Sequence, residues 1–142
     1  MRKGLRIEDL DDLLEGPAAA VLATYRRDGT VMLSPVWFRW TGGAFETTVG
    51  AGDAKVPQVR RDPRVSLTVF EPRPPFRGLE ARGVVEVSEE GVREARLSIA
   101  VRYAGSELGT RYAAPRPHDG FLFRLRPEHL RVWDLADVLP AE

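Results

Sequence analysis

The sequence has no cysteine among its 142 residues and only two histidines, His118 and His129. The absence of cysteine excludes a disulfide framework, a thiolate zinc site and a cysteine nucleophile. Both histidines stand beside proline or charged residues, a setting typical of surface histidines. Because no Ser–His–Asp arrangement or cluster of metal ligands can be assembled, the sequence predicts no metal site and identifies no catalytic residue.

An excess of charge of one sign is also missing, since 21 basic and 21 acidic side chains give a formal net charge of zero. This balance argues against nucleic acid as a partner, because phosphate backbones select for a basic excess. It also leaves little repulsion between copies of the chain, which permits self-association. No apolar run approaches the roughly 18 residues of a membrane span, and no apolar signal segment follows the basic start. We therefore expect a cytoplasmic protein without a membrane partner.

The sequence does contain many short β-branched or alternating segments, separated by Gly, Pro and Asp. Such segments at roughly 8–12-residue spacing are typical of a barrel or sandwich. The length fits one domain covering residues 1–142. The predicted fold is mainly β, a β-barrel with a few short helices. The expected strands are 18–25, 31–40, 44–48, 65–70, 79–87, 121–125 and 130–135, and the expected helices are 7–15, 56–61 and 92–103.

The segment 31–40 is apolar at both its odd and its even positions, whereas a surface strand of a small barrel usually has one wet face. Something must cover its second face, and the candidates are the amino-terminal helix, a bound ligand or another subunit. Pro35 lacks an N–H and interrupts the strand ladder on one side. This interruption could leave backbone groups of Ser34 and Val36 free for a ligand, or it could simply mark a strand edge or bulge.

The segment 50–55 has the sequence Gly-Ala-Gly-Asp-Ala-Lys and precedes a short helix. Backbone N–H groups at a helix start together with Lys55 could form a phosphate cradle. Asp53 opposes that role with a negative charge, and Pro57 removes a donor from the first turn. The alternative is that Asp53 caps the helix and Lys55 is solvated.

Residues 104–120 contain three glycines and two prolines and show little periodicity. We expect a long loop here, serving as a lid or an interface segment, or else disordered.

The order of these motifs resembles the pyridoxamine 5'-phosphate oxidase-like split-barrel flavoproteins, especially the small branch that uses FMN or a deazaflavin (coenzyme F-420). That family forms homodimers with two cofactor sites at the subunit interface, and it acts on small-molecule substrates. The resemblance covers nearly the whole chain. The residues that carry it are Asp28-Gly29, Ser34-Pro35-Val36-Trp37-Phe38, Lys55 and the segments 61–67, 77–83 and 126–133.

The resemblance implies contacts with the cofactor at four places. Residues 34–37 would line the flavin ring, the end of the following strand would touch the ring or ribityl chain, and a lysine would meet the phosphate. A fourth group lies where the partner subunit would reach the cofactor. The residues concerned are Ser34, Pro35, Val36, Trp37, Thr48, Val49 and Lys55, with Arg77, Gly78 and Trp133 in the fourth group.

The chain departs from the family at the phosphate turn, where Asp53-Ala54-Lys55 stands in place of the common Ser-Arg-Lys. The loss of one cation and the gain of one anion would weaken phosphate binding unless Arg60 or Arg61 compensates. Three hypotheses follow. The chain is an FMN- or deazaflavin-dependent oxidoreductase, a cofactor-binding or sequestering homodimer without turnover, or a dimeric barrel that no longer binds a cofactor. In the third case, Asp53 would form a salt bridge with Lys55.

Overall fold

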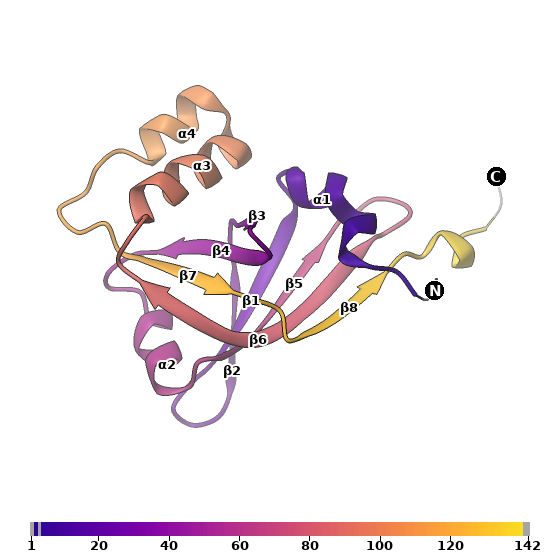
Figure 1. Ribbon diagram of the computed structural model, residues 1–142, viewed down its shortest axis with the longest axis horizontal. Coiled ribbons are helices and arrows are strands. Elements are labelled where there is room, and N and C mark those ends of the chain that lie inside the picture. The colour runs from indigo at the N-terminus through magenta and orange to yellow at the C-terminus, as the bar shows by residue number, and fades with distance from the viewer. Residues whose placement is uncertain (1, 3, 141–142) are drawn as a thin grey trace.

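A computed structural model describes residue 2 and residues 4–140 of the chain. Strands dominate, and they curl around a core with short helices at the rim (Figure 1). None of the helices in these described residues is long and apolar enough to cross a lipid bilayer. The elements are two 3₁₀ helices, η1 (Ile7–Leu10) and η2 (Ala136–Val138); the helices α1 (Asp11–Glu15), α2 (Lys55–Arg61), α3 (Val92–Ala104) and α4 (Ser106–Tyr112); and the strands β1 (Ala19–Tyr25), β2 (Val31–Pro35), β3 (Arg39–Thr41), β4 (Ala44–Val49), β5 (Arg64–Phe70), β6 (Gly78–Ser88), β7 (Phe121–Leu125) and β8 (His129–Trp133).

The strands form one antiparallel sheet in the order β2-β1-β5-β6-β7-β4-β3. The long strand β6 pairs with β5 on one edge, and on its other edge with β7 and then β8. Between β7 and β8 the chain bulges against Gly83, where an added Cβ would lie 2.9 Å from the carbonyl oxygen of Arg126. Such a bulge bends a strand and increases its twist, and the curled sheet of a split barrel results, as the sequence predicts.

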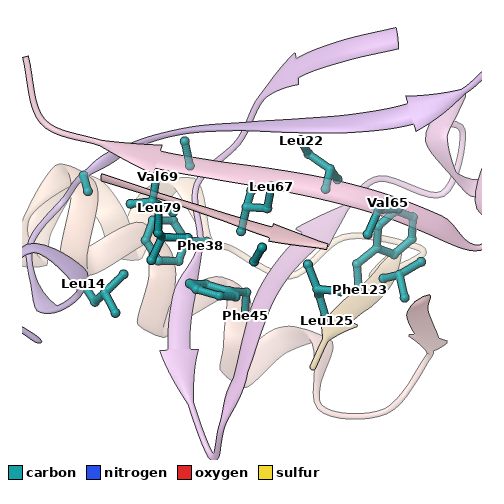
Figure 2. Packing of buried hydrophobic residues seen from close by; sticks show 14 of the residues in the cluster. Leu14, Leu22, Phe38, Phe45, Val65, Leu67, Val69, Leu79, Phe123 and Leu125 are labelled. Atoms are coloured by element: carbon teal, nitrogen blue, oxygen red, sulfur yellow. The ribbon is translucent and has the colours of Figure 1, made fainter. Parts of the chain in front are cut away.

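Alternate residues of the strands fill the interior of the curled sheet. On β5 the side chains of Val65, Leu67 and Val69 are at most 3% exposed, and Figure 2 shows Val69 beside Phe38 and Val65 beside Phe123 in the same cluster. Burial of each such side chain contributes about 1.5–3 kcal/mol. The period-2 pattern of the sequence therefore identifies the core strands correctly.

The prediction of a single strand over residues 31–40 is wrong, because the chain forms β2 and β3 with residues 36–38 between them. These two strands lie at opposite ends of the sheet order, so residues 36–38 carry the chain across and close the barrel. Pro35 ends β2. The expected free backbone N–H of Val36 is also wrong, since it donates a hydrogen bond to the carbonyl of Ala20 at 3.1 Å.

The predicted loop 104–120 is wrong in its first half, which forms α4 against α3. Gly105 separates the two helices with a φ of +87°. At Gly109 a Cβ would lie 2.6 Å from the Ala100 carbonyl oxygen, so only glycine permits this close helix crossing. The two glycines that allow the helical hairpin also lower helix propensity, which explains the wrong prediction. Smaller boundary shifts place the last strand at His129–Trp133 and begin the first helix as a 3₁₀ turn.

The second apolar face of β2 is uncovered in the single chain. Val31 and Leu33 are 45% and 67% exposed, and Pro35 on the same face is exposed as well. The amino-terminal helix packs elsewhere, against β3 and the core. Of the three candidates for a cover, the ligand and the second subunit remain.

Candidate functional site

A pocket of about 310 Å³ opens where β2 ends beside β4, under the α3–α4 hairpin. Its volume falls within the roughly 300–1,000 Å³ range of small-molecule sites. The lining comes from residues 35–37, residues 47–50, the turn with Asp53 and Lys55, and four residues of the hairpin, Arg96, Ile99, Ala100 and Tyr112.

The crossing segment 36–38 positions the Trp37 side chain at this pocket. The hydroxyl of Thr47 donates to the Trp37 carbonyl oxygen at 2.6 Å, and Val36 is bonded to β1 as described above. The indole of Trp37 stacks on the ring of Tyr103, with centroids 5.0 Å apart and planes 4° from parallel. It also contacts Tyr112 at 5.3 Å, which lies at the end of α4. Trp37 is still 40% exposed, so one aromatic wall of the pocket is fixed in place and accessible.

Tyr103 anchors this wall from α3. Its hydroxyl donates to the Ala18 carbonyl oxygen at 2.8 Å and accepts a hydrogen bond from the Phe38 N–H at 3.4 Å. Burial raises the pKa of Tyr103 above its ordinary value, so the phenol stays neutral and retains the proton that it donates.

The turn before α2 neutralises its own lysine. Lys55 Nζ lies 3.0 Å from Asp53 Oδ2, and the Lys55 backbone N–H donates to Asp53 Oδ1 at 2.8 Å. Asp53 accepts the first N–H of α2 as a capping residue does, although the N-cap position itself is Ala54. The solvated lysine of the alternative is wrong, because Lys55 is 9% exposed. Neither Arg60 nor Arg61 lines the pocket. Arg60 lies over Phe121, and Arg61 donates to the Tyr25 carbonyl.

A second cation in the pocket was missed by the sequence analysis. Arg96 of α3 is 3% exposed. Its Nη1 donates to the Asp119 carbonyl oxygen at 2.8 Å, and Nη2 donates to Asp119 Oδ1 at 3.2 Å. Its Nε has no hydrogen-bond partner within the described residues. The sequence does contain a sign of this buried cation. Arg96 follows Val92 by four residues and precedes Ile99 by three, so it places a charge on the apolar stripe of the helix.

The predicted cofactor residues divide into two groups. Six of them line the pocket, and Ser34 precedes them in β2 without lining it. The other three lie at the distant end of β6, where Gly78 pairs with Trp133 and an added Cβ would lie 2.6 Å from the indole. There, Arg77 forms ion pairs with Asp12 and Glu71, each at 2.9 Å. The six pocket residues are Pro35, Val36, Trp37, Thr48, Val49 and Lys55.

Adjoining pockets connect the two groups along β1. A mostly apolar pocket of about 440 Å³ shares residues 35–37 with the first pocket. A third, which contains Arg77, shares residues 17–19 and Phe70 with it. Three pockets with shared lining residues thus lie between Lys55 and Arg77.

The pocket suits an organic anion better than a metal. No group of three or more potential metal ligands occurs in residues 2 and 4–140, and the pocket lining contains no histidine or methionine. A partly exposed indole, strand backbone and a buried guanidinium that is only partly satisfied fit a planar molecule that carries an oxyanion. The residues present therefore fit a flavin-type cofactor, although Asp53 opposes its phosphate.

Comparison with known proteins identifies the family and supports the fold. The family profile described as pyridoxamine 5'-phosphate oxidase matches residues 7–134. Among solved structures, a conserved hypothetical protein from Mycobacterium tuberculosis is 23% identical with a TM-score of 0.80, over 97% of this chain and 91% of that one. An F420 reductase is 28% identical with a TM-score of 0.71, over 92% and 98%. The haem storage protein HutZ from Vibrio cholerae is 19% identical with a TM-score of 0.69, over 93% and 95%. No curated protein matches the sequence.

Proposed function

Because the chain belongs to the pyridoxamine 5'-phosphate oxidase family, we propose that it binds FMN or a deazaflavin in the pocket beside Trp37. We further propose that it is an oxidoreductase, transferring hydride to or from a small organic substrate. The observation that carries the proposal is the accessible indole of Trp37, held by β4 and α3 beside strand backbone and two cations.

In this proposal the protein binds and orients the cofactor and excludes water, and the cofactor when bound supplies the hydride chemistry. Trp37 and Tyr112 offer ring faces to a planar ring system. Thr48 and the backbone of Val49 offer polar groups beside it, and Lys55, paired with Asp53, lines the same pocket.

The uncovered face of the sheet supports a homodimer. Register places Leu33 opposite Ala23, and Ala23 opposite Ser66. Val21 lies opposite both Pro35 and Thr68. The positions on β1, β2 and β5 carry small, apolar or weakly polar side chains, and the charges of this face, Arg82 and Glu80, begin on β6. A second copy would bury it, and we propose that the group at Gly78 and Trp133 then serves the cofactor of the partner.

A second candidate function is favoured by the Asp53–Lys55 salt bridge. A neutralised turn weakens the hold on a phosphate, and the pocket has no histidine to move a proton. The chain would then bind or sequester the cofactor as a homodimer without turnover. The same salt bridge is expected if the barrel has lost cofactor binding altogether.

Titration of the purified protein with FMN and with the deazaflavin separates these functions. We expect micromolar binding of one cofactor with quenching of tryptophan fluorescence, and weaker binding by Lys55→Ala. Reduction of the bound cofactor followed by steady turnover of an acceptor supports the oxidoreductase, whereas binding without turnover supports sequestration. Binding of neither cofactor refutes both functions.

A further inference from the structure

We infer that Arg96 is the anion-binding residue of the Trp37 pocket and that it recognises a phosphate or similar oxyanion of the ligand. The inference deepens the proposed function and rests on it for the identity of the ligand as a cofactor. The turn before α2 contributes no net charge to the pocket, because Asp53 and Lys55 pair with each other.

Arg96 lies within the protein at a place where a charge is costly. A buried guanidinium is tolerated when its charge and its donors are satisfied. Asp119 satisfies it only in part, through one carbonyl and one carboxylate oxygen, and Nε has no partner in the part of the chain that the structure describes. Nε is enclosed by protein atoms, but a guanidinium has five N–H donors, so Nη1 and Nη2 each keep a second N–H beyond their bonds to Asp119, on a side chain that lines the pocket.

Asp119 is also shared with a second arginine. Arg93 Nε donates to both carboxylate oxygens of Asp119, at 3.0 and 2.9 Å. Hydrogen bonds from Arg93, and then from Arg96, hold the pKa of Asp119 below its ordinary value. One carboxylate thus faces two guanidinium groups and leaves one positive charge uncompensated. Arg93 is on the surface with 62% of its side chain exposed, so water screens its charge and the excess is felt mainly at Arg96.

The backbone holds this cluster against the pocket. Gly120 packs so closely on β4 that an added Cβ would lie 2.1 Å from the Val49 carbonyl oxygen. Asp119 is therefore held next to the strand that lines the pocket, and Arg96 from α3 meets it there. A cation on the α3 wall replaces the one that the turn lacks at Ala54.

The test compares FMN with riboflavin, which has the same ring but no phosphate. Arg96→Gln is expected to weaken FMN binding roughly ten- to hundredfold, the usual effect of removing a hydrogen bond to a charged group. Riboflavin binding should stay within about twofold. Arg93→Gln is the comparison outside the pocket, because it leaves Asp119 to compensate Arg96 alone but keeps the donors of Arg96. The preference for FMN should therefore fall by less than in Arg96→Gln. If the protein binds the deazaflavin and not FMN, the same comparison is made between the deazaflavin cofactor and its phosphate-free chromophore.

Asp119→Asn tests the inference in the opposite direction. It removes the carboxylate that competes for Arg96, so FMN binding should tighten while riboflavin binding does not. A purely structural role for the cluster predicts weaker binding of both ligands. This variant and Arg96→Lys, which keeps the charge, also decide the question if Arg96→Gln fails to fold.

Inorganic phosphate separates this inference from the proposed function. Millimolar phosphate should raise the melting temperature of the wild type, raise that of Arg93→Gln by less, and leave that of Arg96→Gln unchanged. If phosphate protects through Arg96 while no flavin binds, the anion site stands and the cofactor proposal fails. If flavins bind but Arg96→Gln and Asp119→Asn leave the preference for FMN unchanged, Arg96 is not the anion-binding residue. Equal losses for FMN and riboflavin, or no phosphate effect on the wild type, also overturn the inference.

Discussion

Replacement of Asp53 by asparagine should strengthen binding of a phosphorylated cofactor. The carboxylate of Asp53 has two roles, since Oδ1 accepts the first N–H of α2 and Oδ2 pairs with Lys55. Asparagine keeps an acceptor oxygen for the N–H and is as good a helix cap as aspartate. It removes only the negative charge, so the change isolates the electrostatic effect.

The magnitude follows from the geometry of the pair. A phosphate oxygen in contact with Lys55 Nζ would lie up to about 6 Å from the Asp53 carboxylate, since each contact is about 3 Å long. At an effective dielectric constant of about 20, two unit charges at that distance repel by about 3 kcal/mol. The Asp53 side chain is 29% exposed, and screening of such a group reduces the effect to about 1 kcal/mol, or roughly fivefold in affinity.

The assay is a titration of Asp53→Asn and wild type with FMN and riboflavin, by tryptophan fluorescence or calorimetry. Asp53→Ala serves as a second variant, because it also loses the helix cap and should cost about 1 kcal/mol of stability. FMN should bind several times more tightly to Asp53→Asn, and riboflavin should bind equally to both proteins. Unchanged or weaker FMN binding by Asp53→Asn would show that the phosphate does not lie beside Lys55.

Three further predictions concern stability and assembly. Gly120→Ala should cost about 2–4 kcal/mol of unfolding free energy in urea, because Gly120 has a positive φ and lies against the Val49 carbonyl. The control Gly52→Ala has open space around it and should change the unfolding free energy by less than about 1 kcal/mol. Leu33→Asp should convert a dimer to a folded monomer near 16 kDa by sedimentation, and a monomeric wild type would refute the dimer. Hydrogen bonds from Arg77 lower the pKa of Glu71 below its ordinary value of 4.5. The ionised Glu71 therefore stabilises the folded state fully above pH 4.5, and this contribution is lost as the pH falls further. Glu71→Gln should lose less unfolding free energy than the wild type between pH 5 and pH 3, and equal losses would contradict this.

The core strands could be predicted because their signal is local. On β6 the residues Leu79, Ala81 and Val85 are buried while Arg82 and Glu86 are exposed, which matches the alternation of the sequence. Such a pattern depends only on which side of the sheet faces water. The pattern therefore does not depend on contacts with distant parts of the chain.

The errors lie where distant parts of the chain decide the structure. Residues 36–38 look like strand residues, but they cross from one end of the sheet to the other because β2 and β3 have different neighbours. Helix α4 is stable through its close contact with α3 at Gly109, a residue that by itself argues against helix. Arg96 was missed because the apolar residues around it dominated the helical pattern.

The candidate site is a product of barrel closure. The crossing segment that joins the two ends of the sheet also carries Trp37, and it is held by β1 through Val36, by β4 through Thr47 and by α3 through Tyr103. Each of these contacts is distant in sequence, so no local pattern could report the position of the indole. A ligand packed on Trp37 would bind only the closed barrel, and it would stabilise the fold by mass action. The crossing segment, residues 36–38, therefore closes the barrel and also carries the side chain on which the ligand would pack.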